Sequence, residues 1–384
     1  YDRMLDLVAR ARLAEEARGL RRLYAQLQLM LSFLPLRGMS TWNAAQVLDH
    51  FFRRQELKAL YAGILADFVV RPSQFQGLGI PLVNVEQAFD RRMPLNLSSA
   101  GPRPSYHAIV GGCGTMVQAL ADGLQHNGGA IYTGVAVERI LLEDGRVRGV
   151  ALADGQTVEA GLVVASGGAR ETFFGLVGRE KLPEPLARRV DEMAFMESVL
   201  MVHVGTDLDP RPYQPSELGY YYGTYDIEGG VGRVQAGEYH EGRDGYLIYV
   251  PSLLSPELAP PGQYAVTVYT IAPDRLAEGT WADRRDELAD KLLACAEAVL
   301  PGLRARSHVR VVLTPDDFRA LTHLQHHSFG GCAPVMGKPG APHRTGIPGL
   351  WFVGAQSESA GGVMNVVSGA RKAMRQLLGA RGNS

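Results

Sequence analysis

Three glycines near the C-terminus lie where backbone groups could bind a ligand. The apolar run Leu350–Val353 predicts a buried strand that leads to Gly354, and Gly361-Gly362 precede a helix predicted from about Val363. A glycine lets a ligand approach the backbone closely. The first N–H groups of a helix have no internal partner and lie at its positive end, so they suit an anionic or electron-rich group. The alternative is a strand–turn–helix whose glycines only permit tight packing, and this segment alone is equally compatible with both.

A second segment has the same design. The apolar run Leu162–Ala165 predicts a strand buried on both faces, and it ends in Ser166-Gly167. Two Asp-Gly turns, at Asp144 and Asp154, separate alternating apolar runs and predict an antiparallel meander before it. Two glycine-bearing strand ends indicate a site at the carboxyl ends of parallel strands, as in a dinucleotide-binding fold. The predicted binding residues are Val137, Ala165, Ser166, Gly167, Gly354, Ala355, Gly361, Gly362, Val363 and Met364.

Composition excludes several other classes of protein. The 384 residues include 39 basic and 40 acidic side chains, for a net charge of -1, so no overall basic field favours nucleic acid. Hydrophobic residues make up 46%, as in an ordinary globular protein. The three cysteines form no CxxC pair, which argues against a disulfide scaffold or a cysteine-rich zinc site. We predict a reduced, cytoplasmic protein without a membrane-spanning helix.

Residues 1 to about 70 are predicted to be helical, with leucines at roughly helical spacing. Residues 1–60 carry ten Lys or Arg against six Asp or Glu, a net charge of +4. Together with the apolar runs at 29–31 and 33–36, this pattern allows peripheral contact with a membrane surface. The alternative is a helix packed on the protein's own core with a solvated basic face. Ser40 or Thr41 is predicted to cap the helix that begins near Ala44.

A few histidines and cysteines could carry chemistry, but the sequence assigns none of them as catalytic. His323 and His327 have a spacing that a metal could use, and His326 lies beside them. No acidic residue lies close to them in sequence, so we expect no metal and consider either a lining of a substrate cavity or ordinary loop positions. Cys113 and Cys332 each follow Gly-Gly, where packing against glycine competes with a redox role.

In four segments the chain resembles the phytoene desaturase and carotenoid isomerase family of FAD-dependent oxidoreductases, including its pyridine nucleotide-disulfide oxidoreductase-like relatives. Gly111-Gly112-Cys113-Gly114 resembles the family's Gly-Gly-Met-Gly helix entry, and the meander through Ala165–Gly167 resembles its second FAD segment. Residues 249–262 resemble the substrate-domain loop. Residues 344–354 with Gly361-Gly362-Val363 resemble the C-terminal flavin motif. The resemblance covers most of residues 40 to 378.

This resemblance implies an α/β fold, in which a Rossmann-like FAD/NAD(P)-binding domain is interleaved with a mixed α+β substrate domain. FAD-binding segments are expected at 105–170 and 340–384, a helical part of the substrate domain at 1–104, and the rest of the substrate domain at 171–339. The implied cofactor is FAD. The implied reaction is hydride transfer between an apolar, polyene-like small molecule and flavin N5, with the free amides of Val363 and Met364 facing the negative charge of the reduced ring.

Two features of the sequence depart from the family pattern. No GxGxxG occurs, so the N-terminal βαβ unit that binds the FAD pyrophosphate is missing from this sequence. Ala355 stands where many relatives have an acidic or hydrogen-bonding residue. Two alternatives follow: a truncated or partner-dependent, non-catalytic half, with another polypeptide supplying the missing unit, or a relative of the flavin amine oxidases, which share the architecture.

Overall fold

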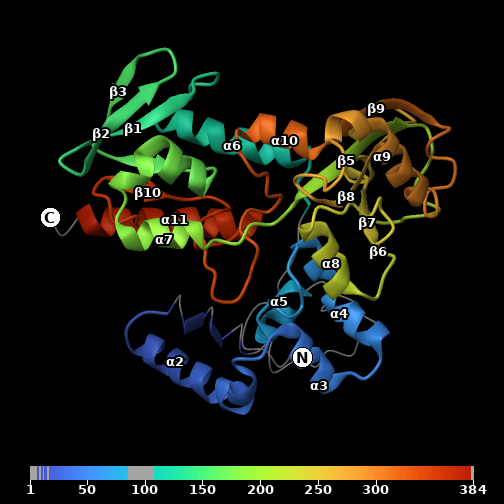
Figure 1. Cartoon of the computed structure of the whole chain (residues 1–384), viewed down its shortest axis with the longest axis horizontal. Coiled ribbons are helices and arrows are strands. Elements are labelled where there is room, and N and C mark those ends of the chain that lie inside the picture. The colour runs from blue at the N-terminus through green and yellow to red at the C-terminus, as the bar shows by residue number, and fades with distance from the viewer. Residues whose placement is uncertain (1–6, 8–9, 12, 15–16, 85–107, 382–384) are drawn as a thin grey trace. The chain divides into compact units, whose positions relative to one another are not determined.

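The computed structural model describes residues 7, 10–11, 13–14, 17–84 and 108–381. The chain divides into two compact units (Figure 1). We call residues 1–108 with 222–232 the helical unit, and residues 109–221 with 233–384 the sheet unit. The predicted division into 1–104, 105–170, 171–339 and 340–384 stays a prediction, because compactness alone does not identify the segments that bind FAD.

The helices of the helical unit fall within residues 20–67, where the leucine spacing predicts them, and also within residues 77–83, beyond the predicted region. They are α2 (Leu20–Phe33), η1 (Leu34–Met39), α3 (Ala44–Phe51), α4 (Gln55–Asp67), η2 (Gly77–Gly79) and α5 (Ile80–Val83). The predicted cap of α3 is wrong. Asn43, rather than Ser40 or Thr41, accepts the Gln46 N–H at 2.9 Å, while the Gln46 side chain accepts the Asn43 N–H at 2.9 Å. This reciprocal pair is a capping box, which satisfies two amides at once.

The core of the sheet unit is a five-stranded sheet in the order β6-β7-β8-β5-β9. Its strands are β5 (Ser198–Thr206), β6 (Leu218–Tyr222), β7 (Gly245–Tyr249), β8 (Tyr264–Ala272) and β9 (Ser307–Leu313). Strand β5 pairs antiparallel with both β8 and β9. Its alternate residues Leu200, Val202 and Val204 are buried, in one cluster with Leu288 and Leu292 of helix α9 (Trp281–Ala296). A strand that buries every second residue has one covered face, and a helix that buries every third or fourth residue packs with one side. Helix α9 therefore covers one face of the five-stranded sheet (Figure 1).

Two smaller sheets carry the predicted binding residues. The first is the predicted meander β1-β2-β3, formed by β1 (Val137–Glu143), β2 (Arg146–Leu152) and β3 (Thr157–Glu159). The second is a parallel pair of β4 (Val163–Ala165) and β10 (Leu350–Phe352). The remaining elements are α6 (Cys113–His126), η4 (Glu171–Gly178), η5 (Arg179–Lys181), α7 (Glu184–Asp191), α8 (Ile227–Gln235), η6 (Pro251–Leu253), η7 (Pro256–Leu258), α10 (Pro315–Thr322) and α11 (Val363–Arg381).

The prediction that the 162–165 strand is buried on both faces is wrong. Val164 in β4 is 40% exposed, whereas all three residues of its partner β10 are buried. Helix α6 has no buried residue either, although Val117, Leu120 and Leu124 give it an apolar face. The sequence pattern identified the strand correctly, but it could not show that one of its faces has no cover among the described residues.

A half-buried carboxyl should make the stability of the helical unit depend on pH. The Tyr222 hydroxyl donates to Asp67 Oδ2 at 2.7 Å, and burial raises the pKa of Asp67 to about 7. The folded state therefore binds more protons than the unfolded state between about pH 4 and pH 7, so the free energy of unfolding falls as pH rises through that window. Because the carboxyl is only half-buried, we expect the free energy of unfolding to fall by about 1 to 2 kcal/mol in total across this window.

The variant Asp67→Asn should remove this slope, because the amide oxygen still accepts from Tyr222 and carries no charge. Denaturant unfolding of both proteins between pH 4 and pH 8 measures it. Asp49→Asn, at an exposed carboxyl, serves as the matched control and should keep the wild-type slope. If Asp67→Asn keeps the wild-type dependence of unfolding free energy on pH, the Asp67 carboxyl does not cause that dependence.

Candidate functional site

The parallel pair brings the two predicted glycine segments together. Ala165 lies opposite Phe352 in the register, and the Val353 N–H donates to the Ala165 carbonyl at 2.9 Å. Both strands therefore end at the same edge. A Cβ placed on Gly354 would lie 3.7 Å from the backbone N of Gly167. The structure thus places Ala165, Gly167 and Gly354 side by side, as the sequence predicts.

The glycines at this edge serve two purposes. Gly167, Gly354 and Gly362 have φ angles of +110°, +102° and +89°, which side chains disfavour. A Cβ on Gly167 or Gly362 would meet nothing within 4 Å, so these two positions face open space. Gly361 differs, because its Cβ would lie only 1.5 Å from the Gly330 carbonyl oxygen. Gly361 therefore permits tight packing, whereas Gly167 and Gly362 face open space, and their use by a ligand stays a prediction.

Helix α11 presents a free N-terminus at this edge. The first intrahelical bond reaches back from the Val366 N–H to the Gly362 carbonyl, so the amides of Val363 and Met364 precede the ladder. Their side chains are 57% and 61% exposed. Both residues therefore lie at the surface of the described chain, at the start of α11.

Two of the predicted binding residues lie differently from the rest. Val137 is the first residue of β1, in the three-stranded sheet rather than in the parallel pair. Ala355 turns its carbonyl toward the protein, where it accepts the Cys332 N–H at 3.2 Å. Its Cβ would also lie 2.7 Å from a Cβ placed on Gly331. Ala355 thus packs against the segment around Gly331 and Cys332, whereas its neighbour Gly354 lies beside Gly167 at the ends of the two strands.

Sequence reasoning missed the polar residues that hold the loop between β10 and α11. His343 is fully buried; its Nδ1 bonds the Phe352 carbonyl at 2.8 Å, so its Nε2 accepts from the Ser359 hydroxyl at 2.6 Å. Gln356 is also buried: its Oε1 accepts the Ala169 N–H at 2.7 Å and its Nε2 donates to the Ser328 hydroxyl at 3.2 Å. The sequence feature that could have indicated these buried side chains is the presence of polar residues in and before a glycine-containing loop between apolar elements.

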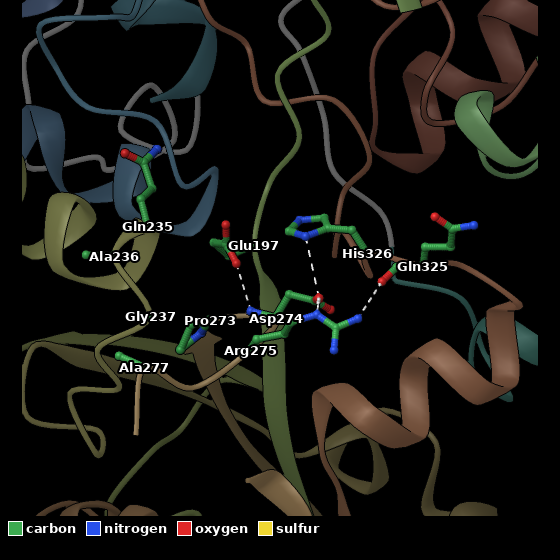
Figure 2. Close-up of a pocket in the computed structure, with 10 residues that line it drawn as sticks. All are labelled: Glu197, Gln235, Ala236, Gly237, Pro273, Asp274, Arg275, Ala277, Gln325 and His326. Carbon is green, nitrogen blue, oxygen red and sulfur yellow. Dashed lines mark hydrogen bonds and ion pairs between the residues drawn. The ribbon is translucent and has the colours of Figure 1, made fainter. Parts of the chain in front are cut away.

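A short segment, residues 326–332, supports that loop, and we call it the strap. Gly330 contacts Gly361, and the Phe329 N–H donates to the Glu197 carbonyl at 2.9 Å. One end of the strap borders a cavity of about 300 Å³ in the sheet unit (Figure 2). Glu197, Asp274, Arg275, Gln325 and His326 are among the residues that line it. Burial raises the pKa of Glu197, against a hydrogen bond from the Asp274 N–H that lowers it.

The three histidines that a metal could have used point to separate partners. His323 is the left-handed C-cap of α10, with a φ of +56°. His327 is buried, stacks on Phe318 and bonds the Ser198 hydroxyl at 2.6 Å. Burial lowers its pKa to about 4, so it is neutral at neutral pH. Within the described residues, no group of three or more His, Cys, Asp or Glu is placed to hold a metal ion.

The two cysteines after Gly-Gly have different environments. Cys332 is buried in the core that includes Phe352, and burial raises the pKa of its thiol to about 12. Cys113 is exposed at the first residue of α6. A thiol with so high a pKa is a poor nucleophile at neutral pH, which favours packing over a redox role for Cys332.

Replacement of Gly361 tests whether the backbone contact supports the site. Gly361→Ala should lower the free energy of unfolding of the sheet unit by about 3 kcal/mol or more, because its Cβ has no space beside Gly330. The expected fall in Tm is roughly 6 to 12 °C, measured by thermal unfolding. Gly114→Ala, at a helical glycine with open space, is the control and should leave Tm unchanged or slightly raised. Equal Tm values for both variants would contradict the packing role.

Comparison with known proteins supports the predicted family. The family model described as FAD dependent oxidoreductase matches residues 9–368. The mouse "Pyridine nucleotide-disulfide oxidoreductase domain-containing protein 2" is 26% identical over 345 residues, covering 83% of this chain and 58% of that protein. The "Phytoene desaturase (lycopene-forming)" of a Paracoccus species is 26% identical over 276 residues, covering 70% of this chain and 54% of that protein. The chain thus spans somewhat more than half the length of these curated relatives.

Solved structures share the fold at low sequence identity. An oxidoreductase from Methanosarcina mazei has a TM-score of 0.57 at 18% identity, covering 90% of this chain and 71% of that one. A redesigned putrescine oxidase has a TM-score of 0.57 at 14% identity, covering 89% and 69%. They confirm the predicted α/β architecture of FAD-dependent oxidoreductases. Since the family model matches nearly the whole chain, the chain belongs to the FAD-dependent oxidoreductase family.

Proposed function

We propose that this chain forms most of an FAD-dependent dehydrogenase that transfers hydride between an apolar, polyene-like substrate and flavin N5. The observation that carries the proposal is the edge where β4 and β10 end beside the free N-terminus of α11. The similarity to a phytoene desaturase supports the choice of substrate class. The observed family supports only the coarser statement, oxidoreductase chemistry with FAD.

The residues present fit FAD. Gly167 and Gly362 each leave open space where a side chain would stand, and both have φ angles that glycine adopts without strain. A planar ring and a ribityl chain need this kind of close backbone approach. Ala360, two residues before Gly362, also has a positive φ of +63°, so the loop between β10 and α11 holds a conformation that costs free energy. Strain of this kind is common at ligand-binding loops.

This chain's own groups would act by orientation and electrostatics. When bound, FAD supplies the hydride acceptor at N5. The amides of Val363 and Met364 would donate to the electron-rich edge of the cofactor, and the dipole of α11 adds to that stabilisation. His343 and Gln356 keep the loop in place through buried hydrogen bonds. We assign no general base among the described residues.

Several apolar side chains of the sheet unit are exposed on the elements that carry the predicted site. Val164 on β4, Val117 and Leu120 on α6, and Val367 on α11 are all exposed. A strand beside β4 with a helix over it would bury these side chains, and it would bring a pyrophosphate-binding turn to the same edge. We propose that such a unit, from this chain's own gene product or from a partner polypeptide, covers this surface.

FAD binding is the decisive experiment. The chain alone and the complete product of its gene are each titrated with FAD and followed by visible flavin absorption. We expect the complete product to bind FAD and the chain alone to bind at least tenfold more weakly, because the covering unit is absent. Equal binding would refute the need for that unit, and a complete product that takes up no FAD would favour the non-catalytic alternative.

Anaerobic reduction of the bound flavin then tests the substrate class. A polyene hydrocarbon in detergent should bleach the flavin, and a primary amine such as putrescine should not. Bleaching by the amine alone would instead favour the amine oxidase alternative. A protein that binds FAD but reacts with neither compound would contradict the proposed substrate class and leave the FAD site intact.

We also propose that helix α2 rests on a membrane surface. It has no buried residue, and Leu20, Leu23, Leu27, Met30 and Leu31 form one exposed stripe at helical spacing. Arg21 and Arg22 lie beside the first turn of that stripe. An apolar stripe with adjacent positive charge suits an anionic bilayer surface. None of the helices within residues 17–84 and 108–381 is both long and apolar enough to span a membrane.

Vesicle sedimentation tests this contact. The protein should bind vesicles of phosphatidylcholine and phosphatidylserine more tightly than pure phosphatidylcholine vesicles. The double variant Leu23→Glu/Leu27→Glu should bind at least tenfold more weakly, because two leucines that would enter the bilayer surface are replaced by charged side chains. Val309→Glu, at an exposed valine of β9, is the matched control and should bind as the wild type does. Equal binding by all three proteins would refute the proposal.

A further inference from the structure

One carboxylate oxygen beside the cavity of Figure 2 has no hydrogen-bond partner. Asp274 is buried, and its Oδ1 accepts from Arg319 Nη1 at 2.8 Å and from the His327 N–H at 2.9 Å. Its Oδ2 accepts no hydrogen bond. His326 Nδ1 lies 3.5 Å and Arg275 Nε lies 3.8 Å from this oxygen (Figure 2). A buried carboxylate oxygen left without a donor is costly, so a donor is expected there.

The contact of His326 Nε2 determines whether Nδ1 carries a hydrogen that it can donate to Asp274. His326 Nε2 lies 3.0 Å from the Met196 carbonyl oxygen. A carbonyl only accepts, so Nε2 must carry a hydrogen. In the neutral ring, Nδ1 is then a bare lone pair that faces the lone pairs of Asp274 Oδ2. A second proton on the ring turns this pair of acceptors into a charge-assisted hydrogen bond.

The charged surroundings of His326 combine both signs. Asp274 and Glu197 are the acidic groups beside it, and Arg275 and Arg319 are the basic ones. His327, next in the chain, stays neutral because burial lowers its pKa to about 4. The remaining charged neighbours are Glu171, which accepts the Gln325 N–H, and Arg170, which stacks on Phe195. Phe195 in turn packs against the His326 ring at 6.2 Å between centroids.

His326 lies where such a bond would hold the strap. Met196, whose carbonyl accepts from His326, also donates its N–H to the Gly331 carbonyl at 3.0 Å. Gly330 supports Gly361 by backbone contact, and the Cys332 N–H donates to the Ala355 carbonyl at 3.2 Å. Hydrogen bonds and backbone contacts therefore run from the His326 ring through Met196 and the strap to the loop that ends at Gly362, and Asp274 Oδ2 lies 3.5 Å from the other nitrogen of that ring.

We propose that His326 is a positioning residue whose doubly protonated ring bridges the Met196 carbonyl and the Asp274 carboxylate, and thereby fixes the strap under the loop between β10 and α11. The bridge itself is a property of the sheet unit. Only its consequence for FAD affinity rests on the proposed function, so the two are measured separately.

Amide hydrogen exchange on the chain without FAD tests the bridge. The reporters are the N–H groups of Phe329 and Cys332, corrected for intrinsic exchange. If the bridge exists, their protection in the wild type should be roughly tenfold lower at pH 8.5 than at pH 5.5, because only a doubly protonated imidazole can donate to both acceptors. His326→Gln should show the low protection at both pH values. Protection in the wild type that does not change with pH would overturn the proposal.

Asp274→Asn gives a result that a merely structural role would not. Its amide oxygen can keep the bonds from Arg319 and His327, while its amide nitrogen can donate to the bare Nδ1 of neutral His326. Protection should therefore stay high at pH 8.5, where the wild type has lost it. His308→Gln, on β9, is the matched control and should follow the wild type. Loss of protection in Asp274→Asn with a retained near-ultraviolet circular dichroism spectrum would overturn the proposal.

If Asp274→Asn does not fold, His326→Arg provides the second test. The His326 side chain is 37% exposed beside the cavity, so a longer side chain has room, and a guanidinium donates in several directions at every pH. Protection should then be independent of pH and high, and low protection would overturn the proposal. FAD affinity of the complete gene product should follow the same pattern. If the amide exchange rates change as expected but the complete gene product binds no FAD, the result supports the bridge and contradicts the proposed function.

Discussion

The contact between Gly330 and Gly361 is the constraint on which the site depends. It joins two stretches of backbone with no side chain between them, and the Ala355 carbonyl meets the Cys332 N–H close by. Contacts of this kind are rigid, because no rotamer can adjust to absorb a displacement. The amides at the start of α11 can therefore be aimed at a ligand only as accurately as the strap beneath them is held.

The strap is held by polar groups rather than by apolar packing alone. Gln356 and His343 are buried, and each makes two side-chain hydrogen bonds, of which the bond from Ala169 to Gln356 joins segments far apart in sequence. Buried networks of this type cost much free energy when partly satisfied and specify one geometry when complete. Asp274 is the member with one unsatisfied oxygen, and it lies at the edge of the network, next to a histidine that can gain a proton.

Periodicity and turn chemistry were enough to predict most elements of the fold. The meander, the helix after Gly112 and the strand before Gly354 all follow from local patterns, and each is present. Exposure of Val164 could not be predicted, because an apolar run shows what a strand can bury and not what covers it. His343 and Gln356 were missed for a related reason: their partners lie in other segments, and one sequence carries no record of which segments meet.

The parallel pairing of β4 with β10 has a consequence for how the molecule folds. The hydrogen bond between Ala169 and Gln356 beside this pair links residues 187 positions apart. The antiparallel strands and α9 of the five-stranded sheet lie between them in the chain. Closing so long a loop is slow unless the intervening chain is already compact. Ligand-binding capacity should therefore be the last property to appear during refolding, after the central sheet has formed and drawn its distant ends together.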